Sequence, residues 1–80
     1  MMNLHIIRPL SKESHNISWL EIETPIGNFV IQEKHVPTIL LLSPDKELTF
    51  CLSNGKQKSI TIKSGIAEIT REEITILLGK

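Results

Sequence analysis

The sequence predicts an all-β fold, a β-sandwich of two mostly antiparallel sheets, and two observations carry this prediction. First, isoleucine is the commonest residue and threonine recurs, whereas alanine occurs only at Ala67; β-branched residues favour strands and alanine favours helices. Second, short apolar runs alternate with turn residues about every eight to twelve positions, which is typical of sandwiches and barrels. At 80 residues, without a linker or an internal repeat, the chain is expected to form one domain, residues 1–80.

The first half of the chain contains four apolar, β-favouring runs that alternate with polar or turn residues. The strands expected there span residues 4–8, 17–24, 29–32 and 38–42. A polar turn over residues 11–16 is expected to separate the first two strands. In the second strand, Leu20 and Ile22 share one face while Glu21 and Glu23 share the other, so one side of this strand should be buried.

Four further strands are expected in the second half, over residues 47–52, 58–62, 66–70 and 74–78. Asn54-Gly55 is a strong hairpin signal between the first two of them. A two-residue turn there would place Leu48 and Ile60 on opposite faces, because a slip of one residue inverts every side chain. A three-residue loop over residues 53–55, with Gly55 in the left-handed conformation, pairs Leu48 with Ile60 and points both inward. We therefore predict the bulged, three-residue loop.

The charge balance gives no indication of a nucleic-acid partner. Lys plus Arg and Asp plus Glu are nine each, so no net field attracts polyanions. Only Trp19, Phe29 and Phe50 are aromatic, and no basic stripe accompanies them. The single cysteine, Cys51, fits a reducing compartment, and no apolar run approaches the roughly 20 residues of a membrane helix. We expect a cytoplasmic protein without direct membrane insertion.

No constellation of catalytic or metal-ligating residues is visible in the sequence. His5, His15 and His35 do not form a short-spaced metal motif, and only Glu33 lies near His35, whereas zinc sites need three or four converging ligands. Cys51 has no histidine or basic cluster beside it, so it fits a buried filler better than a nucleophile. The four glycines are scattered and none opens a helix, which argues against a phosphate loop. The sequence predicts no enzyme activity, no metal and no cofactor.

One long stretch and three later segments carry a resemblance to a known family. Gly27, Ile31, His35 and Pro37 match the order of a Gly-acid-x-Gly-Ile-Leu-Pro-x-His-Ala-Pro-Leu stretch. Similar places for a Lys-Pro-Gly turn, a Ser-Gly-Gly-Phe-x-Glu-Val segment and a Val-Thr-x-Leu strand occur at residues 42–45, 64–69 and 74–77. Together these segments resemble the N-terminal β-sandwich domain of the ATP synthase epsilon subunit, which is called delta in mitochondria.

The chain departs from the family pattern at several positions. Asn28 stands in place of the usual acid, Val30 in place of the second glycine, and Gln32-Glu33 in place of the Leu-Pro pair. The second glycine after Ser64 is missing. The family continues into a two-helix hairpin, whereas this sequence ends at Lys80, so we expect rotor binding without the inhibition that those helices supply.

The resemblance implies a non-catalytic central-stalk subunit of a rotary proton-translocating ATP synthase, which links the gamma subunit to the c-subunit ring. Such a subunit would lie at the inner face of the cell membrane only through the complex, and it would be a monomer outside it. The alternative hypothesis is a stand-alone, diverged β-sandwich module that binds another protein. The gamma subunit and the c-subunit ring are the partners expected under the first hypothesis.

The resemblance also implies which end of the domain faces the ring, a polar corner between Pro25 and Pro37 whose stiffness would limit the entropy lost on docking. The expected ring contacts are Ile26, Asn28, Lys34 and His35. A second interpretation of His35 is a structural tie to a nearby backbone carbonyl. Trp19 falls on the strand face opposite Leu20, where it either packs internally or contacts the gamma subunit.

Overall fold

The computed structural model describes residues 2–79, and all of their regular secondary structure is β. The strands are β1 (Met2–Arg8), β2 (Ser11–Thr24), β3 (Gly27–Gln32), β4 (Thr38–Leu41), β5 (Lys46–Leu52), β6 (Gln57–Ile62), β7 (Gly65–Ile69) and β8 (Glu73–Leu78). Within this part of the chain no helix has the length and apolarity needed to cross a lipid bilayer. The β-sandwich prediction is confirmed in its class.

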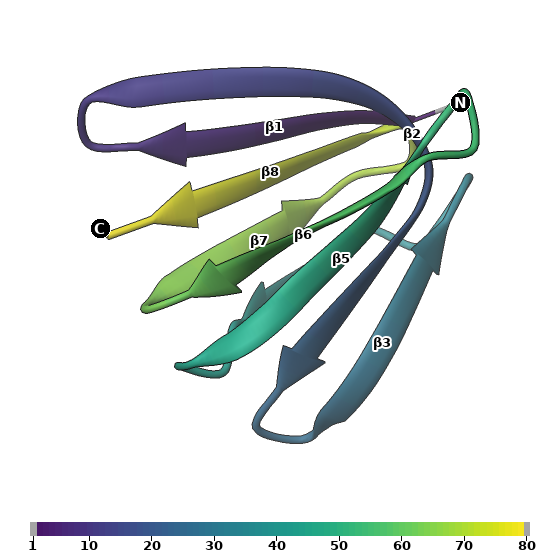
Figure 1. The fold of residues 1–80 in the computed structure, drawn as a ribbon. Coiled ribbons are helices and arrows are strands. Elements are labelled where there is room, and N and C mark those ends of the chain that lie inside the picture. The colour runs from purple at the N-terminus through teal and green to yellow at the C-terminus, as the bar shows by residue number, and fades with distance from the viewer. Residues whose placement is uncertain (1, 80) are drawn as a thin grey trace.

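The strands join into one hydrogen-bonded sheet that curls over on itself (Figure 1). The strand order is β4-β7-β8-β1-β2-β5-β6, and β3 pairs with β2 in addition. Every pair is antiparallel except β1 with β8, which run parallel. One layer therefore contains β4, β7, β8, β1 and the first half of β2. The other contains β3, β5, β6 and the second half of β2.

Strand β2 belongs to both layers because it is long and bends at a bulge. Its first half pairs with β1, from Ser11 opposite Arg8 to Ile17 opposite Met2, and its second half pairs with β3 and β5. The register shifts between Ile17 and Trp19. Ile17 is buried, and burial then resumes at Leu20, so the bulge changes the phase of the buried side chains.

The polar turn expected over residues 11–16 is wrong. These residues form the first half of β2, and the chain reverses instead at Pro9 and Leu10. The segment from Ser11 to Asn16 is polar on both faces, so it lacks the alternation by which a half-buried strand is predicted. Its strand conformation comes from pairing with β1, which supplies partners for its backbone hydrogen bonds and which the local sequence does not predict.

The β5–β6 hairpin has the predicted bulged loop. Leu48 lies opposite Ile60, the Leu52 amide donates to the Lys56 carbonyl over 2.7 Å, and the Gly55 amide donates to the Leu52 carbonyl over 2.9 Å. Gly55 has a φ of 94°, a conformation that glycine adopts without steric cost. Leu48 is fully buried and Ile60 packs against the core, so the predicted inward register is confirmed.

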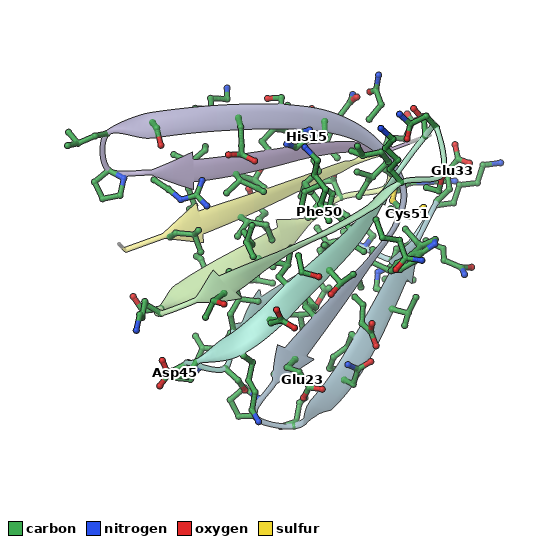
Figure 2. All side chains as sticks on the ribbon, viewed as in Figure 1. His15, Glu23, Glu33, Asp45, Phe50 and Cys51 are labelled. Carbon is green, nitrogen blue, oxygen red and sulfur yellow. The ribbon has the colours of Figure 1, made fainter. Side chains whose placement is uncertain are left out.

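The core lies between the two layers and is almost entirely aliphatic. Its buried members are Met2, Leu4, Ile6, Ile17, Leu20, Ile22, Ile31, Leu42, Leu48, Phe50, Ile62, Ala67, Ile69, Ile74, Ile76 and Leu78. The Phe50 ring from β5 lies 5.2 Å from the His15 ring, which reaches across from the first half of β2 (Figure 2). Among the described residues, every buried side-chain nitrogen and oxygen has a hydrogen-bond partner, so the core carries no polar strain.

Candidate interaction surfaces

The outer face of the β4-β7-β8-β1 layer carries a row of aliphatic side chains. Leu41 lies opposite Ile66, Ile66 opposite Leu77, and Leu77 beside Ile7 in the parallel pair. Paired residues point to the same face of a sheet, so these four side chains cross four strands side by side. Leu41 is 64% exposed and Leu77 is 41% exposed, whereas Ile7 and Ile66 are half-buried. A contiguous exposed apolar surface of this kind typically marks a site of protein contact.

Two hollows extend this row around β4. One, with a volume of about 270 Å³, is lined by Thr24, Pro25, Ile26, Ile39, Leu40 and Leu41. The other, of about 480 Å³, is lined by Pro25, Leu41, Leu42, Pro44, Ser64, Gly65, Ile66, Leu77 and Gly79. None of these lining residues is charged. We call Ile39, Leu41, Ile66 and Leu77 the apolar edge surface.

Strand β4 also presents a free backbone edge. It ends the strand order and pairs with β7 alone among the described strands. The Leu42 amide donates to the Gly65 carbonyl of β7 over 3.1 Å. Because backbone groups alternate in direction along a strand, the N–H and C=O groups of Ile39 and Leu41 point to the open edge. Natural edge strands usually carry lysine or proline that blocks further pairing. The four residues of β4 are Thr-Ile-Leu-Leu, which leaves this edge suited to an added strand.

The turn between β2 and β3 is held by one buried hydroxyl. Thr24 is 6% exposed, and its Oγ1 donates to the Gly27 carbonyl over 2.9 Å and accepts from the Ile26 amide over 3.3 Å. Gly27 has a φ of 138°, which favours glycine. Thr24 ends the strand expected over residues 17–24, and nothing local in the sequence reveals that its hydroxyl is buried. The clamped turn presents Ile26 and Asn28 to solvent.

The four expected ring contacts do not lie together. Ile26 and Asn28 flank the start of β3, whereas Lys34 and His35 follow its other end. Four strand residues, 29–32, lie between Asn28 and the turn that contains Lys34, and they span about 13 Å at about 3.3 Å per residue. The structure thus places the expected contacts at the two ends of β3, and their role in binding the ring stays a prediction.

Each pair of expected contacts has its own surroundings. At the first end the Asn28 side-chain amide donates to a Glu23 carboxylate oxygen over 3.0 Å. At the second end the Lys34 amide donates to the Arg71 carbonyl over 3.1 Å, and Lys34 adopts a positive φ of 65°. His35 Nδ1 donates to the Val36 carbonyl over 2.8 Å, which is the backbone tie considered as its second interpretation.

Trp19 lies on the outer face of the other layer, as its position opposite Leu20 predicted. It is half-buried and stands between Gln32 of β3 and Cys51 of β5. Val30, two residues from Gln32 on the same strand face, is 51% exposed. Glu21 and Glu23 share this strand face with Trp19, so the face is more polar than the apolar edge surface.

Within residues 2–79 no three His, Cys, Asp or Glu side chains converge in a way that could hold a metal ion. The Glu13 carboxylate lies beside two basic side chains, Arg8 and His15. The hydrogen bond from His15 Nε2 is the main cause that holds the pKa of Glu13 below its usual range; burial opposes this shift, and the Arg8 guanidinium adds to it. The apolar edge surface and the β2–β3 turn are therefore candidate sites for binding another protein through shape and apolar contact.

Comparison with known families identifies the sandwich. All of residues 1–80 match the family described as "ATP synthase, Delta/Epsilon chain, beta-sandwich domain". The chain belongs to this family. The family resemblance drawn from Gly27, Ile31, His35 and Pro37 is thus confirmed. No curated protein matches the chain.

Solved structures show the same delta/epsilon sandwich fold in ATP synthases. A chain of the Euglena gracilis mitochondrial ATP synthase, in a structure of OSCP, F1 and c-ring, is 21% identical with a TM-score of 0.85, and the match covers 96% of this chain and 49% of that one. A chain of the Tetrahymena thermophila mitochondrial ATP synthase central stalk and c-ring is 16% identical with a TM-score of 0.83, covering 99% and 63%. The chain thus spans about half to two thirds of the length of these structural neighbours.

Proposed function

We propose that this chain is a non-catalytic central-stalk subunit of a rotary proton-translocating ATP synthase, where it links the gamma subunit to the c-subunit ring. Membership of the delta/epsilon family supports this proposal, as does the occurrence of the same fold in stalk and ring assemblies. The observation that carries it is the apolar edge surface, since a sheet face with Leu41 and Leu77 exposed fits a domain that works inside an assembly. The subunit would reach the membrane only through that complex.

The gamma subunit is assigned to the apolar edge surface. Ile39 and Leu41 expose both their side chains and their backbone edge, so a partner strand could pair with β4 while its side chains cover the two neighbouring hollows. Trp19 is the competing gamma contact. It is favoured less because it is half-buried and bordered by Glu21 and Glu23.

The ring is assigned to the β2–β3 turn. Ile26 is 83% exposed and its amide is held by the Thr24 hydroxyl, while the Asn28 carboxamide is held by Glu23. Docking of this turn should therefore cost little conformational entropy. Lys34 and His35 would contact the ring only if the domain stood the other way up, because they lie at the far end of β3.

Cysteine cross-linking to the polar loop of the ring tests this orientation in the assembled synthase. In a Cys51→Ala background, Asn28→Cys should cross-link efficiently. Lys34→Cys and Asn54→Cys serve as matched probes of the opposite end, where the Ser53 amide bonds the Asn16 carbonyl and Gln32 pairs with Trp19. Cross-links from Lys34 or Asn54 but none from Asn28 would show that the opposite end faces the ring.

Binding to purified gamma subunit tests the other contact. Leu41→Ser combined with Ile39→Ser should weaken binding by at least about tenfold, since two exposed apolar side chains and the edge they flank are altered. Leu10→Ser is the matched control, because Leu10 is 98% exposed at the β1–β2 turn and lies outside both hollows. If Trp19→Ser and Val30→Ser abolish binding while the β4 variant binds normally, the gamma contact lies on the other face.

The same binding assay with purified gamma subunit distinguishes the role in the synthase from that of a stand-alone module. The chain should join a gamma-containing rotor. Failure to bind gamma in any variant, with a folded chain, would favour the stand-alone binding module.

A further inference from the structure

Three side chains from three strands form a hydrogen-bonded chain on the outer face of the first layer. His5 of β1 lies directly opposite Ser14 of β2. On the other side of β1, Glu73 of β8 lies opposite Asn3, two residues from His5 along the strand. The His5 Nδ1 atom is 2.8 Å from the Ser14 hydroxyl oxygen, and the His5 Nε2 atom is 2.9 Å from a Glu73 carboxylate oxygen. The distances fall within the range expected for a nucleophile, a base and an acid that orients the base.

The carboxylate fixes the direction of both hydrogen bonds. An ionised Glu73 can only accept, so His5 Nε2 carries the proton that it donates. In the neutral imidazole the other nitrogen, Nδ1, then carries the lone pair, and the Ser14 hydroxyl donates to it. His5 is therefore placed to remove the Ser14 proton. The His5 side chain is 24% exposed, which shields the chain partly from competing water.

A shallow hollow adjoins the Ser14 hydroxyl. It has a volume of about 190 Å³ and is lined by Asn3, His5, Ser14, His15 and Asn16. Asn3 and Asn16 pair with each other one step along the same outer face, and within residues 2–79 neither carboxamide makes a side-chain hydrogen bond. A small acyl group bonded to Ser14 would thus have room, and two amide donors would lie close to its carbonyl oxygen.

We propose that Ser14 is a reactive nucleophile that accepts an acyl group from small activated esters. The hydroxyl proton passes to His5 Nδ1 as Ser14 Oγ bonds to the carbonyl carbon of the ester. The tetrahedral intermediate then expels the leaving alcohol, which takes the proton from Nδ1, and Ser14 remains as an ester. Glu73 holds the imidazole and stabilises its positive charge during the step. The reaction needs no oxidant, metal or other co-reactant.

The acyl group should leave Ser14 slowly. The Ser14 ester has a poorer leaving group than an activated ester, so its hydrolysis should be slower than its formation. Acyl-Ser14 should accordingly accumulate to about one group per chain. Ser14 is in this sense a modification site, and it lies away from β4 and from the β2–β3 turn.

Acetylation with p-nitrophenyl acetate, followed by peptide mapping of the full chain, tests the proposal. Ser59 is the matched control within the same molecule, since it is an exposed strand serine whose hydroxyl bonds Thr49 Oγ1 over 2.9 Å and not a base. Ser14 should acetylate about a hundredfold faster than Ser59, the factor expected of general-base assistance. Equal rates at the two serines would overturn the proposal.

Variants separate the base from its orienting acid. His5→Gln should reduce Ser14 acetylation to the rate of Ser59, and Glu73→Gln should reduce it in part, whereas His35→Gln should leave it unchanged. Full Ser14 acetylation in His5→Gln would overturn the role of His5. Because the Ser14 and Ser59 rates are compared in the unaltered chain, the test does not depend on the variants folding. A fluorophosphonate probe should label the same serine.

Discussion

At the scale of single residues, His35 shows how one side chain can satisfy a structural role at a position where a partner contact was expected. Its Nδ1 donates to the Val36 carbonyl over 2.8 Å, and the side chain is half-buried. We expect His35→Ala to lower the free energy of unfolding by about 0.5–1.5 kcal/mol, because one partly exposed hydrogen bond is lost. Urea denaturation measures this change in the free energy of unfolding. An unchanged midpoint would contradict the structural role and favour a role of His35 in partner contact alone.

Gly65 at the start of β7 has no space for a side chain. A Cβ atom there would lie 2.5 Å from the Leu77 carbonyl oxygen and 2.9 Å from Leu78 Cδ2. Gly65→Ala should therefore cost about 1–3 kcal/mol of stability, since the backbone of β8 would have to move. Gly79→Ala is the matched control. Its Cβ would meet only the rotatable Ser64 hydroxyl, at 2.8 Å, so its thermal midpoint should change little.

At the scale of elements, the β1–β2 hairpin is tied by polar side chains where the β5–β6 hairpin is packed by apolar ones. Glu13 lies 3.2 Å from Arg8 and 3.0 Å from His15, measured between nitrogen and carboxylate oxygen. The Arg8–Glu13 pair joins β1 to β2 and so favours their register, whereas the His15–Glu13 bond lies within β2 and orients the Glu13 carboxylate. In the β5–β6 hairpin the register is stabilised instead by Leu48 and Ile60, which lie opposite each other and pack into the core.

The lowered pKa of Glu13 gives this hairpin a defined pH response. The folded-state pKa lies below the unfolded one, so the stabilisation is complete above the ordinary carboxyl pKa and is lost as the pH falls through the folded value. Because the Glu13 side chain is 44% exposed, the effect should stay below about 0.5 kcal/mol after solvent screening.

An NMR titration of the Glu13 carboxyl carbon measures the shift directly. The folded chain should titrate below the usual glutamate range, and His15→Gln should raise the pKa of Glu13, because the hydrogen bond from His15 is the largest cause of the shift. Arg8→Gln should raise it by less. A Glu13 pKa that does not change in either variant would contradict this account.

At the scale of the whole molecule, β2 makes the two layers one cooperative unit. It pairs with β1 in one layer and with β3 and β5 in the other, and its bulge lies between Ile17 and Trp19. Loss of this strand would remove the antiparallel partner of β1 in one layer and the shared partner of β3 and β5 in the other. The functional surfaces therefore depend on the same strand, since the Thr24 turn ends it and Ser14 lies in its first half.

Leu20→Ala tests this cooperativity. Leu20 is fully buried just after the bulge, so the change should cost about 2–5 kcal/mol, a large share of the roughly 5 kcal/mol expected of a domain this small. Fluorescence of Trp19, the only tryptophan, reports one layer, and histidine NMR signals of His5 report the other. Both should give the same urea midpoint in the variant. Separate midpoints would show that the layers unfold independently.

The sequence by itself determined the class of the fold, most of the strands, the loop at Gly55 and the family. Those features depend on β-branched residues, turn chemistry and alternation, which act between near neighbours along the chain. Only the tertiary structure decided that residues 11–16 form a strand, that Ile26 and His35 lie at opposite ends of β3, and that His5, Ser14 and Glu73 meet. These depend on the pairing of β1 with β2 and β8, between residues as far apart as His5 and Thr75. Such pairings are determined by burial of the shared core, so the pattern of neighbouring residues along the chain does not predict them.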